Sequence, residues 1–141
     1  MKSSIFLTNT DTTIGFISKD KKSLDKAKNR IDGKEYITAL SSLKHLKKRV
    51  PKKFKKTVRR AKKTTFILNK NYSFRIIQDD NHNLLINRLN FAFTTSANKS
   101  GKEFDIEYAI DKSDIIIYPI SNPKTPSKLY KINKKKIKRL R

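Results

Sequence analysis

The sequence contains no cysteine, which excludes disulfide bonds and thiolate-bound metals. Its two histidines, His45 and His82, are too few to build a zinc site by themselves. Glycine occurs only three times, and the chain has no Walker loop, no Rossmann glycine pattern and no His-Glu-x-x-His motif. No segment resembles a signal peptide or a transmembrane helix. We therefore expect a soluble, cytoplasmic protein without a metal site.

Acidic residues are also scarce, because 12 Asp and Glu stand against 35 Lys and Arg, for a formal net charge of +23. Such a charge favours a polyanionic partner, since a positive field attracts phosphate groups and accelerates their encounter with the protein. An AT-rich coding sequence offers a second explanation, because lysine, asparagine and isoleucine are all abundant. Composition alone leaves both explanations open.

A chain of 141 residues, 35% of them hydrophobic, predicts a single domain that spans residues 1–141. Segments with strand periodicity alternate with segments of helical periodicity, so we expect an α/β domain with a mixed sheet. The predicted strands lie within residues 5–7, 14–17, 35–42, 64–69, 72–77, 90–95, 114–119 and 127–132. The predicted helices lie within residues 21–31, 44–63, 79–89 and 103–113.

Three of these segments carry more detailed expectations. Ser23 is a plausible N-cap for the first helix. Residues 44–63 include twelve Lys and Arg and no acid. Within them Val50, Phe54, Val58 and Ala61 keep a helical stripe, which Pro51 interrupts at an expected first turn. Residues 114–119 form a continuous apolar run, which is typical of a buried strand.

Short polar elements stand at the ends of several predicted strands and helices. Taken singly, each has an ordinary explanation: Thr-Asp-Thr after a strand forms a turn, and Lys-x-Arg at a helix end binds the last carbonyls. Arg75 could simply pair across the sheet. The elements are "TDTTIG" (10–15), "KNR" (28–30), "FRII" around Arg75, "TTSAN" (94–98), and "PSKLYKI" (126–132) with the terminal "RLR".

In this order the elements resemble the YrdC family, the threonylcarbamoyl-AMP synthases. The "TSANKSG" segment (95–101) is the most specific element, "TDTTIG" is next, and Lys-x-Arg is weak alone. The resemblance extends from Thr8 to Arg141. It implies a single α/β domain with a twisted mixed β-sheet and helices around an open basic cleft.

The resemblance also implies a reaction in which L-threonine, bicarbonate and ATP, with Mg²⁺, yield threonylcarbamoyl-AMP and pyrophosphate. The product would serve threonylcarbamoyladenosine modification of tRNA, with tRNA or other RNA and the proteins of the tRNA threonylcarbamoyl transfer machinery as further partners. Residues implied to bind ATP are Lys28, Arg30, Lys34, Asn71, Ser96, Asn98 and Arg141, with Arg139 equally suited to the last position. Residues implied to bind threonine are Thr12, Arg75, Thr94 and Ser127. No residue is assigned a catalytic role, because the reaction needs orientation and charge stabilisation more than an acid–base pair.

The orientation of Arg75 follows from strand geometry. Side chains alternate along a strand, so Arg75 should point away from the side on which Phe74 and Ile76 lie. A guanidinium there could clamp a carboxylate with two parallel hydrogen bonds.

The chain also departs from the family pattern. Asn9 stands where the family has proline, and Ile14 where an aromatic residue is common. "RRAKKTTFIL" (59–68) keeps Thr65 but lacks the prolines and glycine of the matching family segment. A shortened family member explains these changes, and a paralogue that lost activity is the alternative.

A basic RNA-binding module without catalysis is a further hypothesis, supported by residues 44–63 and the basic C-terminal tail. RNA binding would favour aromatic side chains interleaved with the cations, ready to stack on bases. Residues 44–63 contain only Phe54, which fits the apolar stripe. The polar elements therefore favour the enzyme.

Overall fold

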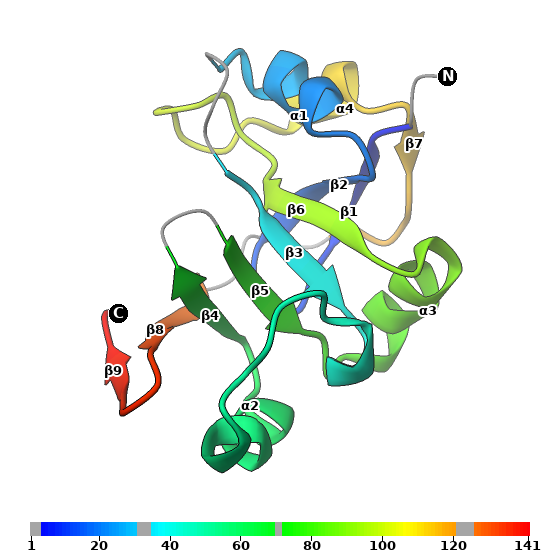
Figure 1. Cartoon of the computed structure of the whole chain (residues 1–141). Coiled ribbons are helices and arrows are strands. Elements are labelled where there is room, and N and C mark those ends of the chain that lie inside the picture. Colours follow the sequence, from blue (N-terminus) through cyan, green and yellow to red (C-terminus); the bar gives the residue numbers. More distant parts are fainter. Residues whose placement is uncertain (1–3, 31–34, 70–71, 121–125) are drawn as a thin grey trace.

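A computed structural model describes residues 4–30, 35–69, 72–120 and 126–141 of the chain (Figure 1). The strands are β1 (Phe6–Asn9), β2 (Ile14–Ser18), β3 (Ile37–Leu40), β4 (Thr64–Asn69), β5 (Tyr72–Ile76), β6 (Ala92–Ser96), β7 (Ile115–Ile116), β8 (Lys128–Ile132) and β9 (Ile137–Arg139). The helices are α1 (Lys21–Lys28), α2 (Lys55–Arg60), α3 (Asp80–Leu89) and α4 (Ile106–Lys112). Two 3₁₀ turns, Leu43–His45 and Lys52–Phe54, precede α2. The predicted α/β fold with a mixed sheet is confirmed.

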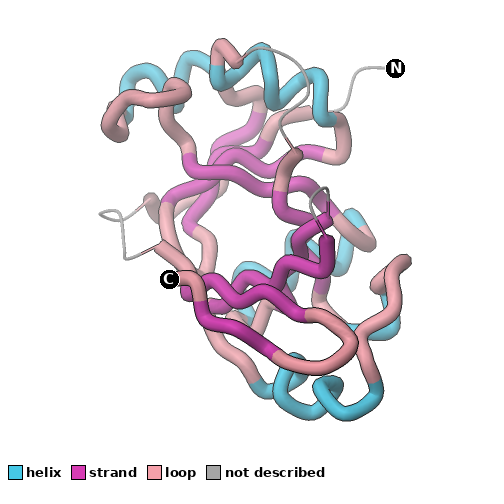
Figure 2. Tube along the Cα trace, turned by 60° about the vertical axis from the view of Figure 1, so that its left-hand side comes forward, coloured by secondary structure: helices cyan, strands magenta, loops and turns pink. Residues whose placement is uncertain are grey.

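All nine strands belong to one sheet with the order β7-β1-β2-β6-β3-β5-β4-β8-β9. Three neighbouring pairs are parallel (β1/β7, β3/β5 and β4/β8), and the other pairs are antiparallel. Figure 2 shows the strands arranged in an open ring. This curvature brings the turn after β1 close to the two residues that precede β8, and both segments line one cavity.

One face of the sheet is covered by α1 and α4, which lie side by side in Figure 1. Leu24 of α1 and Ala109 of α4 pack against Leu7 and Phe16, and all four side chains are buried. The Tyr108 hydroxyl donates a hydrogen bond to the Ala27 carbonyl and so joins the two helices.

The opposite face is covered by α3. Ile86 packs there against Ile17, Ala39 and Ala92 in a second buried cluster. Ile17 follows Phe16 in β2, and neighbouring residues of a strand point to opposite faces. The three helices α1, α3 and α4 therefore enclose the sheet from both sides.

A third cluster stabilises the far end of the sheet. Val58 of α2 and Val50 pack with Phe66 and Phe74. The rings of Phe66 and Phe74 stack with centroids 5.7 Å apart. Because Phe74 is fully buried, this cluster also fixes the strand that carries Arg75.

The prediction of a helix over residues 44–63 is wrong in extent, because only α2 and two separate 3₁₀ turns form. Pro51 stands between the two turns, and many like charges at helical spacing oppose a longer helix. Ser23 is not the N-cap of α1. Asp20 is, and its carboxylate accepts from the Lys22 N–H (3.2 Å) and from the Ser23 hydroxyl (2.7 Å).

The expected buried strand at 114–119 is also wrong in extent. Only Ile115–Ile116 pair with β1, at the edge of the sheet. Ile115 is 43% exposed and Tyr118 is 72% exposed, because an edge strand lacks a neighbour on one side. No helix within the described ranges is long and apolar enough to cross a membrane.

Candidate functional site

A cavity of about 380 Å³ opens on the α3 face of the sheet. Its walls come from the turn between β1 and β2, the ends of β3 and β6, the middle of β5, and the two segments at Ser127 and Arg141. Two predicted residues, Lys34 and Asn71, lie outside the described residues. The predicted residues that line the cavity are Thr12, Arg30, Arg75, Thr94, Ser96, Ser127 and Arg141.

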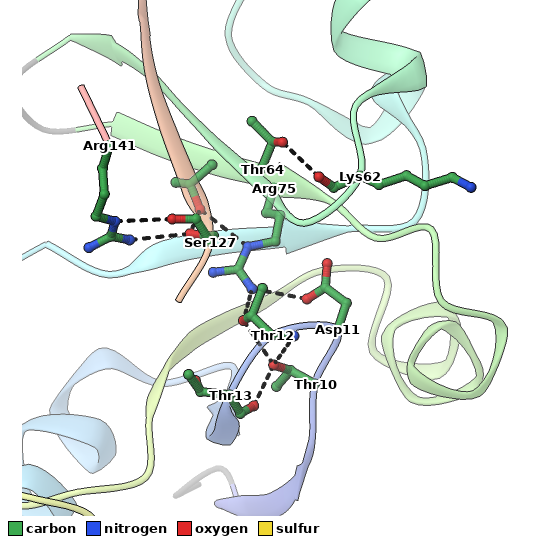
Figure 3. Close-up of polar contacts among 10 residues, drawn as sticks. Thr10, Asp11, Thr12, Thr13, Lys62, Thr64, Arg75, Ser127 and Arg141 are labelled. Atoms are coloured by element: carbon green, nitrogen blue, oxygen red, sulfur yellow. Dashed lines mark hydrogen bonds and ion pairs between the residues drawn. The ribbon is translucent and has the colours of Figure 1, made fainter. Parts of the chain in front are cut away.

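Arg75 occupies the centre of this arrangement (Figure 3). Its Nη1 donates to Asp11 Oδ1 at 3.0 Å and to Thr12 Oγ1 at 2.8 Å, and its Nε donates to Thr65 Oγ1 at 3.2 Å. No hydrogen bond within the described part of the chain engages Nη2. As predicted, Arg75 points away from the buried Phe74 cluster and lines the cavity.

The Asp11–Arg75 pair is buried, since the side chains are 5% and 7% exposed. A charge in such a place is tolerable only when an opposite charge and hydrogen bonds compensate its desolvation. Asp11 supplies that compensation from the turn after β1. The pair therefore fixes the guanidinium in one position at the cavity wall.

A chain of hydroxyl groups connects Arg75 to the last residue of the sequence. Thr65 Oγ1 and Ser127 Oγ lie 2.8 Å apart and share a hydrogen bond. Arg141 donates from Nε to the Ser127 carbonyl (3.0 Å), and its Nη2 lies 3.5 Å from Ser127 Oγ. Arg139 lies on β9 and is not among the residues that line the cavity. Of the two candidate arginines, Arg141 is the one at the site.

The "TDTTIG" segment forms a tight turn, because the Thr10 hydroxyl donates to the Thr13 carbonyl (2.6 Å) and accepts from the Thr12 N–H (3.1 Å). Gly15 follows on β2, directly opposite Ser96 of β6. A Cβ at Gly15 would lie 2.9 Å from Thr10 Cγ2 and 3.0 Å from the Thr95 carbonyl oxygen. Glycine is therefore required for the turn to approach β6 so closely.

Lys28 is placed differently from its implied role in phosphate binding. It is only 2% exposed and is not among the residues lining the cavity. Its Nζ donates to the Ser96 carbonyl (2.9 Å) and to the carbonyl and side-chain oxygens of Asn98 (3.0 and 3.2 Å). Its ammonium group therefore holds the 96–98 backbone in place, because its N–H groups donate to the oxygens of Ser96 and Asn98.

Asn98 likewise points into its own loop. Its Oδ1 also accepts from the Ser96 hydroxyl, and its Nδ2 donates to the Lys99 and Lys102 carbonyls at 3.0 and 2.7 Å. The signature loop is thus stabilised by the two residues that were implied to bind ATP. Ser96, which ends β6, is the loop side chain that reaches the cavity wall.

The Lys-x-Arg motif ends α1 in a well-defined turn. Asn29 adopts a left-handed conformation (φ 49°, ψ 53°), and the N–H groups of Asn29 and Arg30 bond to the Lys26 and Asp25 carbonyls. This turn directs Lys28 into the loop and Arg30 toward the cavity. The Arg30 guanidinium lies 5.1 Å from the Tyr36 ring centroid.

The charge of the cavity wall is predominantly positive. Arg30, Arg75 and Arg141 contribute guanidinium groups, whereas Glu35 is the carboxylate among the lining residues and pairs with Lys21 at 2.6 Å. Such a wall attracts carboxylates and phosphates.

Two titratable groups near the cavity are shifted by burial. Burial raises the pKa of the Tyr36 hydroxyl well above its usual range, and the hydrogen bond that it donates to Asp25 adds to the effect. Burial lowers the pKa of His82 on α3, while the nearby Asp11 carboxylate opposes that shift. Both side chains are therefore neutral at pH 7.

Several residues of this site were assigned no role from the sequence, among them Asp11, Tyr36 and Thr10. Asp11 lies within "TDTTIG". An aspartate flanked by threonines was the sequence signal that could have predicted a buried carboxylate paired with a cation. Tyr36 carried no such signal. Within the described ranges, His, Asp and Glu side chains do not gather into a cluster that could hold a metal ion.

No family model matches the sequence, and comparison with curated proteins finds no match. Comparison with solved structures shows that the chain has a YrdC-like fold, as the motifs indicated. Escherichia coli YciO superposes with a TM-score of 0.78 at 17% identity, over 99% of this chain and 82% of YciO. A protein of Methanobacterium thermoautotrophicum, solved in solution, superposes with a TM-score of 0.66 at 19% identity, over 91% of this chain and 74% of that one.

Pyrococcus abyssi Sua5 is also similar, and its structure is a complex with L-threonine. It superposes with a TM-score of 0.77 at 19% identity, over 98% of this chain. The match covers 50% of Sua5, so the chain spans about half of the length of that protein. These likenesses establish the fold.

Proposed function

We propose that the protein is an L-threonylcarbamoyladenylate synthase, a nucleotidyltransferase that makes threonylcarbamoyl-AMP for threonylcarbamoyladenosine modification of tRNA. The observation that carries the proposal is the guanidinium of Arg75, buried and fixed by Asp11 at the wall of a polar cavity. The motif order of the sequence, the YrdC-like fold and the threonine complex of P. abyssi Sua5 support it.

In this proposal threonine binds at Arg75. Arg75 offers Nη2 to the carboxylate of the amino acid, because Nε and Nη1 already bind Thr65, Thr12 and Asp11. The hydroxyl groups of Thr94 and Ser127 lie on the same wall and complete the threonine subsite.

ATP binds with its phosphates toward Arg30, Arg141 and Ser96, and Mg²⁺ enters bound to those phosphates. To donate to a phosphate, the Ser96 hydroxyl gives up its bond to Asn98 Oδ1. Glu35 is already paired with Lys21, so we expect the phosphate oxygens and water to supply most of the metal ligands. Lys28 and Asn98 act indirectly in this proposal, by shaping the loop that ends in Ser96.

Threonine and bicarbonate condense to a carbamate with loss of water. A carbamate oxygen then attacks the α-phosphorus of ATP, the bond to the β-phosphate oxygen breaks, and pyrophosphate leaves. The residues of the cavity align the reactants and stabilise negative charge, which supplies much of the barrier reduction in phosphoryl transfer chemistry. The product would pass to the proteins that transfer threonylcarbamoyl groups to tRNA in the cytoplasm.

The experiment is pyrophosphate release by the purified full chain with L-threonine, bicarbonate, ATP and Mg²⁺. We expect release that stops when threonine or bicarbonate is omitted, and a product with the mass of threonylcarbamoyl-AMP. Release that continues without threonine would refute the substrate assignment. A folded sample that shows no turnover would identify an inactive paralogue.

A further inference from the structure

The face of the sheet opposite the candidate cavity carries a second hollow, of about 170 Å³, between α1 and the 3₁₀ turn Leu43–His45. We call it the aromatic groove. Thr38 lines it, whereas the preceding Ile37 lines the candidate cavity, because neighbours on β3 point to opposite faces. Four aromatic side chains line the groove, namely Tyr36, Tyr72, Phe91 and Phe93.

The aromatic side chains belong to three neighbouring strands or their ends. The Phe91 and Phe93 rings are 5.8 Å apart in an edge-to-face arrangement. Both are only partly buried. Tyr72 extends the stack of core rings outward, with its centroid 6.4 Å from that of Phe74. A sheet face with accessible rings on adjacent strands is a platform on which planar groups can stack.

Lysines from two distant segments surround these rings. Lys19 and Lys47 place their Nζ atoms 4.8 and 5.3 Å from the same Phe91 ring centroid, and Lys21 lies 5.0 Å from the Phe93 centroid. A cation over an exposed ring gains little free energy, and two ammonium groups beside one ring repel each other. Neither Lys19 nor Lys47 forms an ion pair with a described carboxylate. An anion bound between them would therefore be stabilised.

The positive surface continues beyond the aromatic groove. Along residues 44–48, His45 and Lys47 line that groove, whereas Lys44 and Lys48 line a different cavity of about 280 Å³, which shares no lining residue with the groove. A third cavity of about 800 Å³ shares Arg49 and other residues with the second. We call these two cavities the basic groove. Every charged side chain that lines it is Lys or Arg, and none forms an ion pair with a described carboxylate.

We propose that the aromatic groove and the basic groove together bind a single-stranded nucleic acid, with bases stacked on Phe91 and Phe93 and phosphates along the lysines. Stacking rings beside a continuous cationic groove is the arrangement by which proteins bind single strands with little sequence preference. A duplex keeps its bases paired and cannot offer them to the rings. An acidic polypeptide would use the cations but would gain nothing from the rings.

This site goes beyond the proposed synthase activity. Glu35 and Tyr36 line both hollows, but Lys47, Phe91 and Phe93 line only the aromatic groove. Its test is the fluorescence anisotropy of a labelled 12-nucleotide uridine RNA mixed with the full chain. We expect saturable binding whose affinity falls with salt, with a slope of about −0.7 per phosphate contact. Replacing Lys19 and Lys47 with Gln should reduce that slope by about 1.4.

Substitution of the phenylalanine rings shows whether the groove binds nucleic acid in particular or any polyanion. Phe91→Leu and Phe93→Leu retain apolar volume but remove the stacking surface, so each should weaken RNA binding by at least about fivefold. Heparin binding should change by less than twofold. Phe54→Leu is the matched ring control, and Lys26→Gln with Lys112→Gln is the matched charge control, since none of these residues lines either groove.

The two ring variants and the variant at Lys19 and Lys47 should keep threonine-dependent pyrophosphate release at the level of the unmodified protein, because none of these residues lines the candidate cavity. If a ring variant fails to fold, photocrosslinking of a 4-thiouridine RNA to the unmodified protein provides the second measurement, and the peptide containing residues 91–93 should carry the crosslink. A deoxyuridine strand of the same length shows whether the 2′-hydroxyl of the sugar contributes to the binding affinity. Equal weakening of heparin and RNA binding by the ring variants, equal affinity for polyglutamate, or crosslinks confined to other peptides would overturn the proposal.

Discussion

Replacing Arg75 with lysine tests the centre of the candidate site. Lysine keeps the positive charge and can still reach Asp11. A single ammonium group cannot, however, donate hydrogen bonds to Asp11, to Thr65 and to a ligand carboxylate at once, as the planar guanidinium can. The hydrogen bonds at stake are Nε to Thr65 Oγ1 at 3.2 Å and the bond that Nη2 would offer to threonine. We therefore expect loss of ligand affinity with retention of the fold.

A hydrogen bond to a charged group contributes about 1.5 to 3 kcal/mol. The Michaelis constant for threonine should therefore rise about 10- to 100-fold in Arg75→Lys, because each 1.4 kcal/mol is a factor of ten. The constant for ATP should change by less than threefold, since Arg30, Arg141 and Ser96 form the proposed phosphate subsite. Ser96→Ala should have the opposite pattern and raise the constant for ATP more than that for threonine.

The assay is steady-state pyrophosphate release with each substrate varied in turn, and circular dichroism and urea unfolding confirm the fold. Arg88→Lys is the matched control, because Arg88 is an exposed arginine of α3 outside the candidate cavity. If Arg75→Lys raises both Michaelis constants alike, or leaves the threonine constant unchanged, the assignment of the threonine carboxylate to Arg75 is refuted.

Three further variants test the supporting structure. Lys28→Met leaves the Ser96 and Asn98 carbonyls without their donor. The free energy of unfolding should therefore fall by about 1.5 to 3 kcal/mol, and the Michaelis constant for ATP should rise. An unchanged urea midpoint would contradict this. Gly15→Ala places a methyl group against Thr10 and the Thr95 carbonyl, so unfolding measurements should show a loss of about 1 to 3 kcal/mol. Burial lowers the pKa of His82, so the unfolded chain binds a proton more readily, and stability should decline as the pH falls below about 6.5. His82→Gln should flatten that decline in urea midpoints measured between pH 5 and 7.5.

The elements with strong periodicity were predictable from sequence. The α3 helix over Asp80–Leu89, with Asp79 as its N-cap, agrees closely with the predicted segment 79–89. The hairpin of β4 and β5 forms at the predicted positions, and Phe74 and Arg75 face opposite sides as strand alternation requires. Local pattern was sufficient in these places because local and tertiary preferences agree.

The segment 44–63 was less predictable, because its hydrophobic stripe indicates a helix while its charge opposes one. Val50 and Phe54 do reach the third core cluster, as the stripe implied, but from 3₁₀ turns and their connections. The stripe therefore predicted burial correctly and the length of the helix incorrectly. Charge repulsion between residues four apart is a small term per pair, yet seven such pairs of cations occur in this segment.

Motif resemblance located the site better than it located the individual contacts. It could not show that Lys28 and Asn98 bind each other, because residues 70 positions apart meet only through the packing of α1 against the end of β6. Nor could it show that Asp11 holds Arg75, a contact between residues 64 positions apart. Side chains with the chemistry to bind a ligand can equally bind the protein itself. Only the tertiary fold decides which of the two they do.

Strand register links the candidate cavity to the aromatic groove. On β3, Ile37 pairs with Thr94, Thr38 with Phe93, and Ala39 with Arg75. The first and third of these pairs supply Thr94 and Arg75 to the cavity, and the second supplies Phe93 to the groove. A slip of one residue would exchange the two faces, because side chains alternate with a period of two. The same pairing thus positions the wall that carries Arg75 on one side of the sheet and the aromatic platform on the other.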